Sequence, residues 1–372
     1  MSDRYFTRRQ FVHSVSGSIA AMCLPASSWP AADDVRVFQP HPGDWRTFEV
    51  VTTVQPRELD GSTTVWVPIP SVTSGWQRTL ENNFSGNATM ARQVSLADDT
   101  QAVMAQFDAG TSEPSLQVVS RVQTQSRGMP DRSRHIQKLG AAERKLWLHS
   151  TAYKPTDGVV RKTADQITAG AHGDLAKAQR IYDWIVVNTY REPKVRGCGL
   201  GDIKALLETG NLGGKCADLN GLFVGLCRAA GLPARDAYGV RLSPSEFGYR
   251  ELGGKPAALQ GAQHCRAEVF LENYGWVAMD PADVDKVMRQ ETSEWIKDAD
   301  NPLVAPVRKG LFGGWEGNWM AYNQSDDLAL VGSSGPPLAF FMYPQGENEK
   351  GRYDSLDAAA FTYTISSREI TA

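Results

Sequence analysis

The strongest periodic pattern in the chain lies between residues 213 and 233. Gly231 is typical of the position just after a helix end, and Pro233 prevents a helix from continuing. The pattern predicts a helix whose first turn holds Cys216, directly after a glycine pair and a lysine. Apolar side chains recur at the spacing of one helical face at Leu219, Leu222, Phe223, Leu226, Cys227 and Ala230.

The position of Cys216 favours a reactive thiol. Free backbone N–H groups and the helix dipole stabilise an anion at a helix start, and this lowers the pKa of a thiol there. The two preceding glycines let a substrate approach the backbone closely. The alternative is that Cys216 is a small apolar residue that only packs at the helix start.

Two further titratable residues follow on strand-like runs. His264 is the only histidine after Cys216, and it opens an alternating run that ends at Leu271. A turn at residues 273–275 leads into a second run that ends with Asp280 and a proline. A thiol nucleophile needs this set, because the base shares the thiol proton and the acid orients the base.

The register of this predicted hairpin does not decide which of two aspartates is the acid that orients His264. His264 precedes Tyr274 by ten residues and Asp280 follows it by six, so a regular hairpin leaves the two side chains four residues apart. That offset is roughly 13 Å at ~3.3 Å per residue. Asp283 lies nearer the matched position and is the alternative acid.

Four segments, taken together and in order, resemble the transglutaminase-like superfamily of papain-type fold. The resemblance implies that Cys216 is the nucleophile, His264 the base and Asp280 the orienting acid, with no metal and no cofactor. It implies an α+β fold in which a helix carries the cysteine and packs on an antiparallel sheet. The matching segments are residues 214–218, 223–235, 264–269 (the His-Cys-Arg-Ala-Glu-Val run) and 274–281.

Short alternating strands predict a β-sandwich-like domain over residues 43–130. The strands are residues 46–54 and 63–68, joined through a turn at Asp60-Gly61, and a later hairpin of residues 102–107 and 116–122. The tryptophans at positions 66 and 76 are expected in the core or at an interface.

The transglutaminase-like domain is expected over residues 136–372, with its core at 170–290. A helix from Asp174 is expected beside the Cys216 helix, and the strands within 300–372 are expected to extend the catalytic sheet. The long connection 243–262 is either a functional lid or a surface insert.

The beginning of the chain predicts export. Arg8-Arg9 followed by a mildly apolar run is typical of a twin-arginine signal peptide, which we place at residues 1–32. No later segment reaches the ~18 apolar residues of a membrane span. We therefore expect a periplasmic or extracellular protein without a membrane span.

The net charge and the cysteine spacings bear on whether the protein binds nucleic acid or zinc. The net charge of −3 over 372 residues gives no electrostatic case for binding nucleic acid. The cysteines after the signal fit no zinc spacing, and a disulfide between Cys198 and Cys265 stays open.

The predicted function is thiol-dependent acyl transfer that cleaves amide or peptide bonds through a thioester. The substrate is expected to be a protein or peptide, with the cell wall as one source. Transglutaminase-type cross-linking of proteins is the alternative enzyme activity, and a non-catalytic cell-envelope binding module is the alternative from another class. The sequence does not identify the acyl donor or acceptor.

Overall fold

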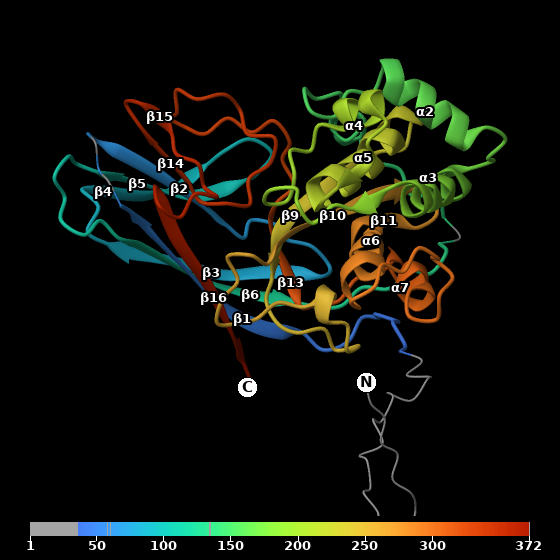
Figure 1. Cartoon of the computed structure of the whole chain (residues 1–372), viewed down its shortest axis with the longest axis horizontal. Coiled ribbons are helices and arrows are strands. Elements are labelled where there is room, and N and C mark those ends of the chain that lie inside the picture. Colours follow the sequence, from blue (N-terminus) through green and yellow to red (C-terminus); the bar gives the residue numbers. More distant parts are fainter. Residues whose placement is uncertain (1–35, 58, 60, 134, 372) are drawn as a thin grey trace, which may run out of the picture. The chain divides into compact units, whose positions relative to one another are not determined.

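The computed structural model describes residues 36–371 except 58, 60 and 134, and the predicted signal at residues 1–32 lies outside this range. Two antiparallel sheets of these residues form a β-sandwich (Figure 1). The first sheet contains β16 (Phe361–Ile370), β1 (Arg46–Pro56), β6 (Leu116–Thr124) and β3 (Gln77–Gly86), in that order. The second contains β15 (Gly351–Arg352), β14 (Gln345–Asn348), β2 (Thr63–Ile69), β5 (Gln101–Phe107) and β4 (Met90–Ser95).

The inner faces of the two sheets share an apolar core around Val54, whereas Phe48 and Val50 of β1 lie in a separate apolar cluster. Every second residue of β1 from Phe48 to Val54 is buried, as expected for a strand with one face toward a core. Val54 of β1 packs in the same cluster as Val67 of β2 and Phe107 of β5. Trp66 and Trp76 are buried, as the prediction that they lie in the core or at an interface requires.

The predicted hairpins of this region are wrong in their pairing. β1 pairs with β6 and β16, whereas β2 pairs with β5 and β14, so the connection through Gly61 crosses from one sheet to the other. β5 and β6 likewise belong to different sheets. A turn signal marks where the chain reverses, but it does not say which of two sheets the next strand joins.

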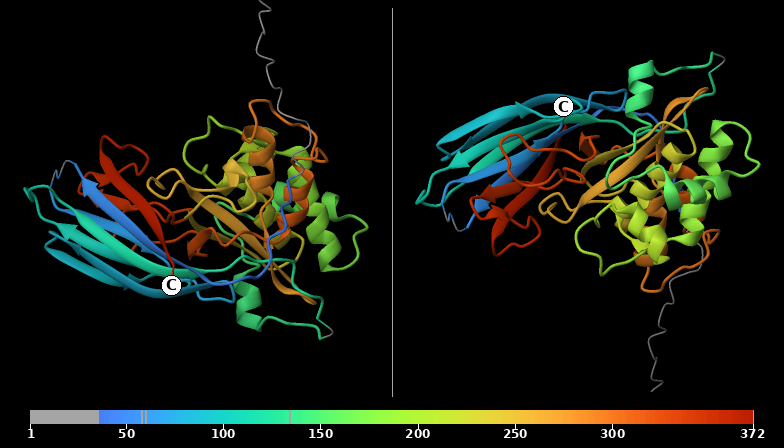
Figure 2. Two further views of the ribbon diagram at one scale, coloured as in Figure 1. Left: turned by 90° about the horizontal axis from the view of Figure 1, so that it is seen from below. Right: turned by 90° about the horizontal axis from the view of Figure 1, so that it is seen from above.

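The final strand also differs from its prediction. β16 pairs with β1 along ten positions, from Thr47 opposite Ile370 to Pro56 opposite Phe361. It therefore belongs to the sandwich and, contrary to the prediction, does not extend the sheet that carries His264. Figure 2 shows this red C-terminal strand beside the blue β1 from two further directions. Phe361 of β16 is buried in the sandwich core, and the burial of this ring favours the pairing of the C-terminal strand with β1.

The sheet that carries His264 is a separate antiparallel unit, and only two short strands of residues 300–372 join it. Its order is β12 (Phe312–Gly313), β11 (Gly275–Met279), β10 (Gln263–Leu271), β9 (Ala234–Arg241) and β13 (Trp319–Asn323). β10 pairs with β9 on one side and with β11 on the other, as the predicted hairpin requires. The α+β class with antiparallel sheets is therefore confirmed.

Helices pack on this sheet and on each other. The predicted face of α3, from Ala178 to Val186, is buried, and α3 packs beside α5 as expected. None of the helices within the described range combines the length and apolarity needed to cross a bilayer. The helices are α1 (Ala141–Leu146), α2 (Gly158–Thr168), α3 (Asp174–Asn188), α4 (Ile203–Thr209), α5 (Cys216–Ala229), η1 (Arg250–Leu252, a 3-10 turn), α6 (Pro281–Gln290) and α7 (Ala305–Gly310).

The helix α5 is buried on every side, which exceeds the single apolar face predicted for it. Its polar residues are consequently paired inside the protein. Near its end, the Arg228 guanidinium lies 2.9 Å from Asp326, and Lys154 lies 2.6 Å from the same carboxylate and 3.2 Å from Asp236. Two buried cations thus face two carboxylates, which is the pairing that buried charges require.

The position of β16 leads to a stability prediction. Phe361→Ala removes a ring that is 1% exposed, and we expect the free energy of unfolding to fall by about 3–5 kcal/mol. Thr364→Ala, at an exposed position of the same strand, is the matched control and changes it by less than about 0.5 kcal/mol. Urea denaturation measures both, and equal small effects would contradict the role assigned to this strand in the core.

Candidate active site

Cys216 is the first residue of α5, and hydrogen bonds to a neighbouring loop fix the position of this helix start. The Asp218 carboxylate accepts hydrogen bonds from the backbone N–H groups of Lys215, Leu200 and Gly201, at 2.9, 3.0 and 2.9 Å. Gly199 has φ +95°, and a Cβ there would lie 1.9 Å from the Asp218 carboxylate, so only glycine fits. The glycine-rich loop of residues 197–202 therefore lies beside the start of α5.

A short parallel pairing brings a distant arginine to the same place. β7 (Tyr190–Arg191) pairs with β8 (Gly213–Gly214), with Arg191 opposite Gly214. Arg191 therefore sits across from the residue two positions before Cys216. Nothing in the sequence near Cys216 indicates this neighbour, because it depends on a two-residue strand pair.

The Cys216 thiol is surrounded by other thiols and by His264. Hydrogen bonds from Cys198 and Cys265, together with His264, hold the pKa of Cys216 well below its usual value, although burial opposes this. The hydrogen bond with Cys216, together with burial, raises the pKa of Cys198 well above normal, and burial together with Cys216 does the same to the pKa of Cys265. All four cysteines in the described range are free, so the Cys198–Cys265 disulfide left open by the sequence is not formed.

His264 binds two aspartates through one ring nitrogen. Its Nε2 lies 2.7 Å from the Asp280 carboxylate and 3.3 Å from that of Asp283. Burial and Arg241 oppose the charged ring, but the two carboxylates outweigh them and raise the pKa of His264 to about 9. Nδ1 is left as the ring nitrogen available to Cys216. The predicted acid and its alternative therefore both contact the predicted base.

The strand register explains how Asp280 reaches His264. Ala267 faces Met279 across β10 and β11, so Arg266 would face Asp280 and His264 lies two residues further on. The offset is roughly 7 Å at ~3.3 Å per residue, about half of the predicted one, and diagonal neighbours on one face of a sheet meet at this distance. Asp280 ends the strand and caps α6, accepting from Asp283 N–H at 3.2 Å.

Asn220 is a site residue that the sequence reasoning missed. Its Nδ2 donates to Asp280 Oδ1 at 2.9 Å and to the Cys265 carbonyl at 2.8 Å, and its Oδ1 accepts from Ala282 N–H at 3.2 Å. Asn220 lies four residues after Cys216 on the same helix face. An asparagine one helical turn after the candidate nucleophile is the sequence signal that could have identified Asn220.

The two aspartates also face two buried arginines. Arg241 donates to both oxygens of Asp283, at 2.5 and 2.7 Å, and Arg266 Nε lies 3.6 Å from Asp280. Although burial acts in the opposite direction, Arg241 and His264 lower the pKa of Asp283 well below normal. Burial and the neighbouring Asp283 raise that of Asp280.

The same three side chains have the spacing of a metal site but not its electrostatics. Ligand atoms of His264, Asp280 and Asp283 lie within 4.8 Å of one another. The guanidinium groups of Arg241 and Arg266 already occupy the place of a cation beside both carboxylates. The arrangement therefore fits an imidazole held by hydrogen bonds better than a metal centre.

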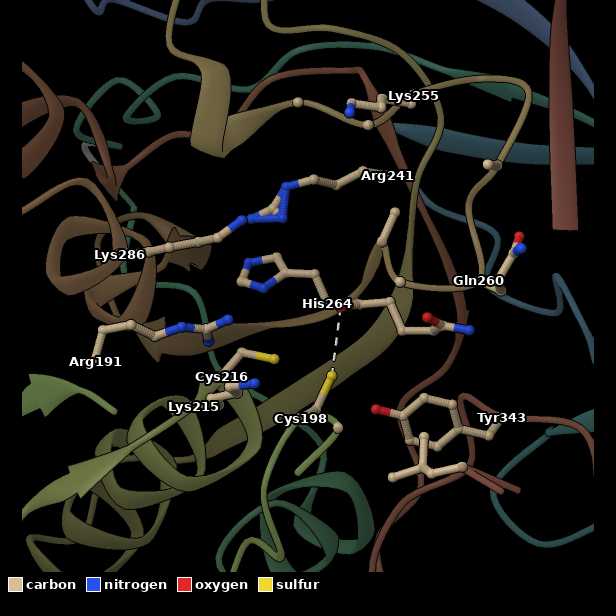
Figure 3. A pocket seen from close by; sticks show the side chains of 18 residues that line it. Arg191, Cys198, Lys215, Cys216, Arg241, Lys255, Gln260, His264, Lys286 and Tyr343 are labelled. Atoms are coloured by element: carbon tan, nitrogen blue, oxygen red, sulfur yellow. Dashed lines mark hydrogen bonds between the residues drawn. The ribbon is translucent and has the colours of Figure 1, made fainter. Parts of the chain in front are cut away.

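Cys216 and His264 line a pocket of about 450 Å³ (Figure 3). Seven residues of the connection 243–262, including Lys255, Gln260 and Gly261, line the same pocket, so this segment forms one wall of it. The tryptophan-rich segment 313–319 is not among the lining residues. Its Trp315 and Trp319 pack against Trp76 instead, at ring distances of 5.3 and 5.9 Å.

The electrostatics of the site predict selective labelling. Iodoacetamide at pH 6 is expected to alkylate Cys216 in the folded protein before the other cysteines, because only its pKa is lowered. Peptide mass spectrometry measures the order of modification, with Cys216→Ser as the control. Faster modification of Cys198 or Cys265 would contradict the assignment.

A known family matches the segment of the chain that carries the site. Residues 161–281 match the transglutaminase-like superfamily, a range that contains Cys216, His264 and Asp280. An uncharacterized protein of Haemophilus influenzae is 33% identical over 342 residues, covering 87% of this chain and 90% of its own length.

A solved structure at a TM-score of 0.50 shares the fold. A candidate cysteine protease from Cytophaga hutchinsonii superposes with a TM-score of 0.50 at 16% identity, covering 88% of this chain and 100% of its own. The periplasmic domain of TgpA from Pseudomonas aeruginosa gives a TM-score of 0.39 at 17% identity, covering 71% of this chain and 78% of its own. The chain therefore contains a domain of the transglutaminase-like superfamily at residues 161–281, the segment that carries the site.

Proposed function

We propose that the protein is a thiol-dependent acyl-transfer enzyme that hydrolyses amide or peptide bonds, with Cys216 as nucleophile, His264 as base and Asp280 as orienting acid. The observation that carries the proposal is the 2.7 Å contact between His264 Nε2 and Asp280, in a pocket that His264 shares with Cys216. The lowered pKa of Cys216 and the raised pKa of His264 favour a thiolate–imidazolium pair at neutral pH.

The proposed reaction proceeds through a thioester. The Cys216 thiolate attacks the substrate carbonyl, and the carbonyl oxygen gains negative charge. The N–H of Cys216 has no carbonyl partner within the helix, since it is the first helical residue, and it can stabilise that oxygen. The His264 imidazolium gives its proton to the leaving amine as the C–N bond breaks. A water, deprotonated by His264, then releases the acid and restores the thiol pair.

The charge of the pocket favours water over a lysine side chain as the acceptor. Five basic side chains line the pocket, which contains no lining carboxylate within the described residues. A lysine ammonium would be repelled there, so hydrolysis is supported better than protein cross-linking. A binding module, the candidate from another class, has no need of a thiol with a lowered pKa.

The function is tested by following both possible products. Incubated with a glutamine-containing protein such as casein and a labelled primary amine, the enzyme is expected to release ammonia or peptides and to incorporate little amine. Cys216→Ala is expected to abolish the release. Amine incorporation that exceeds hydrolysis would show cross-linking instead, and release that persists in Cys216→Ala would overturn the proposal.

Matched variants separate the two aspartates in the same assay. In Asp280→Asn an amide N–H faces His264 Nε2 and favours the wrong tautomer, so turnover should fall by about 10³–10⁴-fold. Asp283→Asn weakens a 3.3 Å contact while keeping a partner for Arg241, and a loss below about tenfold is expected. A larger loss in Asp283→Asn than in Asp280→Asn would transfer the acid role to Asp283.

We further propose that the protein is exported by the twin-arginine route to the periplasm or beyond. The support is Arg8-Arg9 and the apolar run after it, which lie outside the described residues. Replacing both arginines with lysine is expected to retain the protein in the cytoplasm, as measured by cell fractionation. Undiminished export of the double variant would rule out this route.

A further inference from the structure

The pocket around Cys216 is strongly basic. Figure 3 shows Arg191, Arg241 and Lys286 reaching toward the His264 ring, with Lys215 beside Cys216 and Lys255 on the opposite wall. The whole chain has a net charge of −3, so this concentration of positive charge does not follow from composition. It is assembled from separate parts of the chain: β7, the residue before α5, β9, the connection 243–262 and α6.

Two of these cations are neutralised within the protein. Arg241 is bound to Asp283 at 2.5 Å, and Lys286 lies 3.3 Å from the Glu251 carboxylate while donating to the Glu251 carbonyl at 2.6 Å. These pairs have a structural explanation, because each holds its partner element in place.

The other three cations, Arg191, Lys215 and Lys255, form no comparable ion pair within the described residues. Within the described range, no carboxylate lies within 4 Å of the side-chain nitrogens of Arg191, Lys215 or Lys255; Arg191 donates only to the Gln290 side chain, at 3.1 Å. Lys215 is half-buried, and burial, with Arg191 nearby, lowers its pKa. Holding like charges together at a concave, partly dry surface costs stability, and the cost falls when an anion binds.

We infer that the acyl substrate is an acidic peptide, with a carboxylate group close to the carbonyl that Cys216 attacks. This inference rests on the proposed function, since it names the substrate class of the same site. Arg191 lies two residues from Cys216 across the β7–β8 pair, and Lys215 is adjacent to Cys216 in the chain. A carboxylate held by these two groups therefore lies near the reacting bond. Lys255 offers a third contact at the opposite wall.

An isosteric pair of reagents tests the charge selection without turnover. Iodoacetate and iodoacetamide transfer similar groups to a thiolate and differ in charge. The measured quantity is the ratio of their alkylation rates at Cys216, followed by peptide mass spectrometry. Because the His264 imidazolium also attracts iodoacetate, the informative result is how the ratio changes between variants and with salt.

Each of Arg191→Gln, Lys215→Gln and Lys255→Gln is expected to lower the iodoacetate-to-iodoacetamide ratio by about twofold to fivefold. Lys162→Gln makes the same change of net charge at an exposed position of α2 outside the pocket, and it should leave the ratio unchanged. Raising the salt from 0.02 to 0.5 M should lower the wild-type ratio, since the screening length shortens. A ratio that none of the three pocket variants moves would overturn the inference.

Peptidyl thioesters test the substrate class itself. N-acetyl-Glu-Ala and N-acetyl-Gln-Ala thioesters of one neutral thiol differ only in a carboxylate, and chromatography measures their cleavage. The glutamate compound is expected to react about tenfold faster, and Arg191→Gln should reduce that preference while Lys162→Gln should not. Equal rates, or faster cleavage of the glutamine compound, would overturn the acidic substrate while leaving the thiol mechanism intact. If neither thioester is cleaved although the alkylation ratio responds to the pocket variants, the charge selection stands and the acyl-transfer proposal fails.

Discussion

The hydrogen bonds of Asp280 join the parts of the site that lie far apart in the chain. One oxygen binds His264 of β10, and the other accepts from Asn220 of α5 and from the backbone of α6. The residue is fully buried, so a missing partner would leave a carboxylate in an environment that penalises its charge. This requirement fixes the cysteine helix, the histidine strand and the following helix relative to one another.

The two aspartates beside His264 differ in their partners. Asp283 is paired with Arg241 through both oxygens and carries a fixed negative charge beside the imidazole. Asp280 has the shorter contact and the better position to set the ring tautomer. A second carboxylate near His264 stabilises its imidazolium form, while Asp280 keeps the closer contact with the ring.

Local patterns predicted the centre of the fold well. The apolar stripe after Cys216, the face of α3 and the strands that carry His264 and Asp280 are each encoded within a few residues, and each has the predicted type. The register between His264 and Asp280 was missed by two residues, because the turn is centred on Asn273 and not on Tyr274. Asn220, Arg191 and Lys286 depend on contacts between distant segments, which no local pattern contains. The polar strand β3 and the pairing of β16 escaped prediction for the same reason.

The place of β16 has a consequence for how the molecule is made. β1 begins at Arg46 and pairs along its length with a strand that ends at Ile370, so the sandwich cannot close until nearly the whole chain has been synthesised. The backbone of β16 also bonds to the wall of the pocket, where Leu259 donates to Ile365 and Ser367 donates to Pro256. A nascent chain that stops short of this strand lacks both the closed sandwich and the braced pocket wall. Formation of the pocket around Cys216 is thereby tied to completion of translation, and pairing across such a sequence distance is expected to make folding slow.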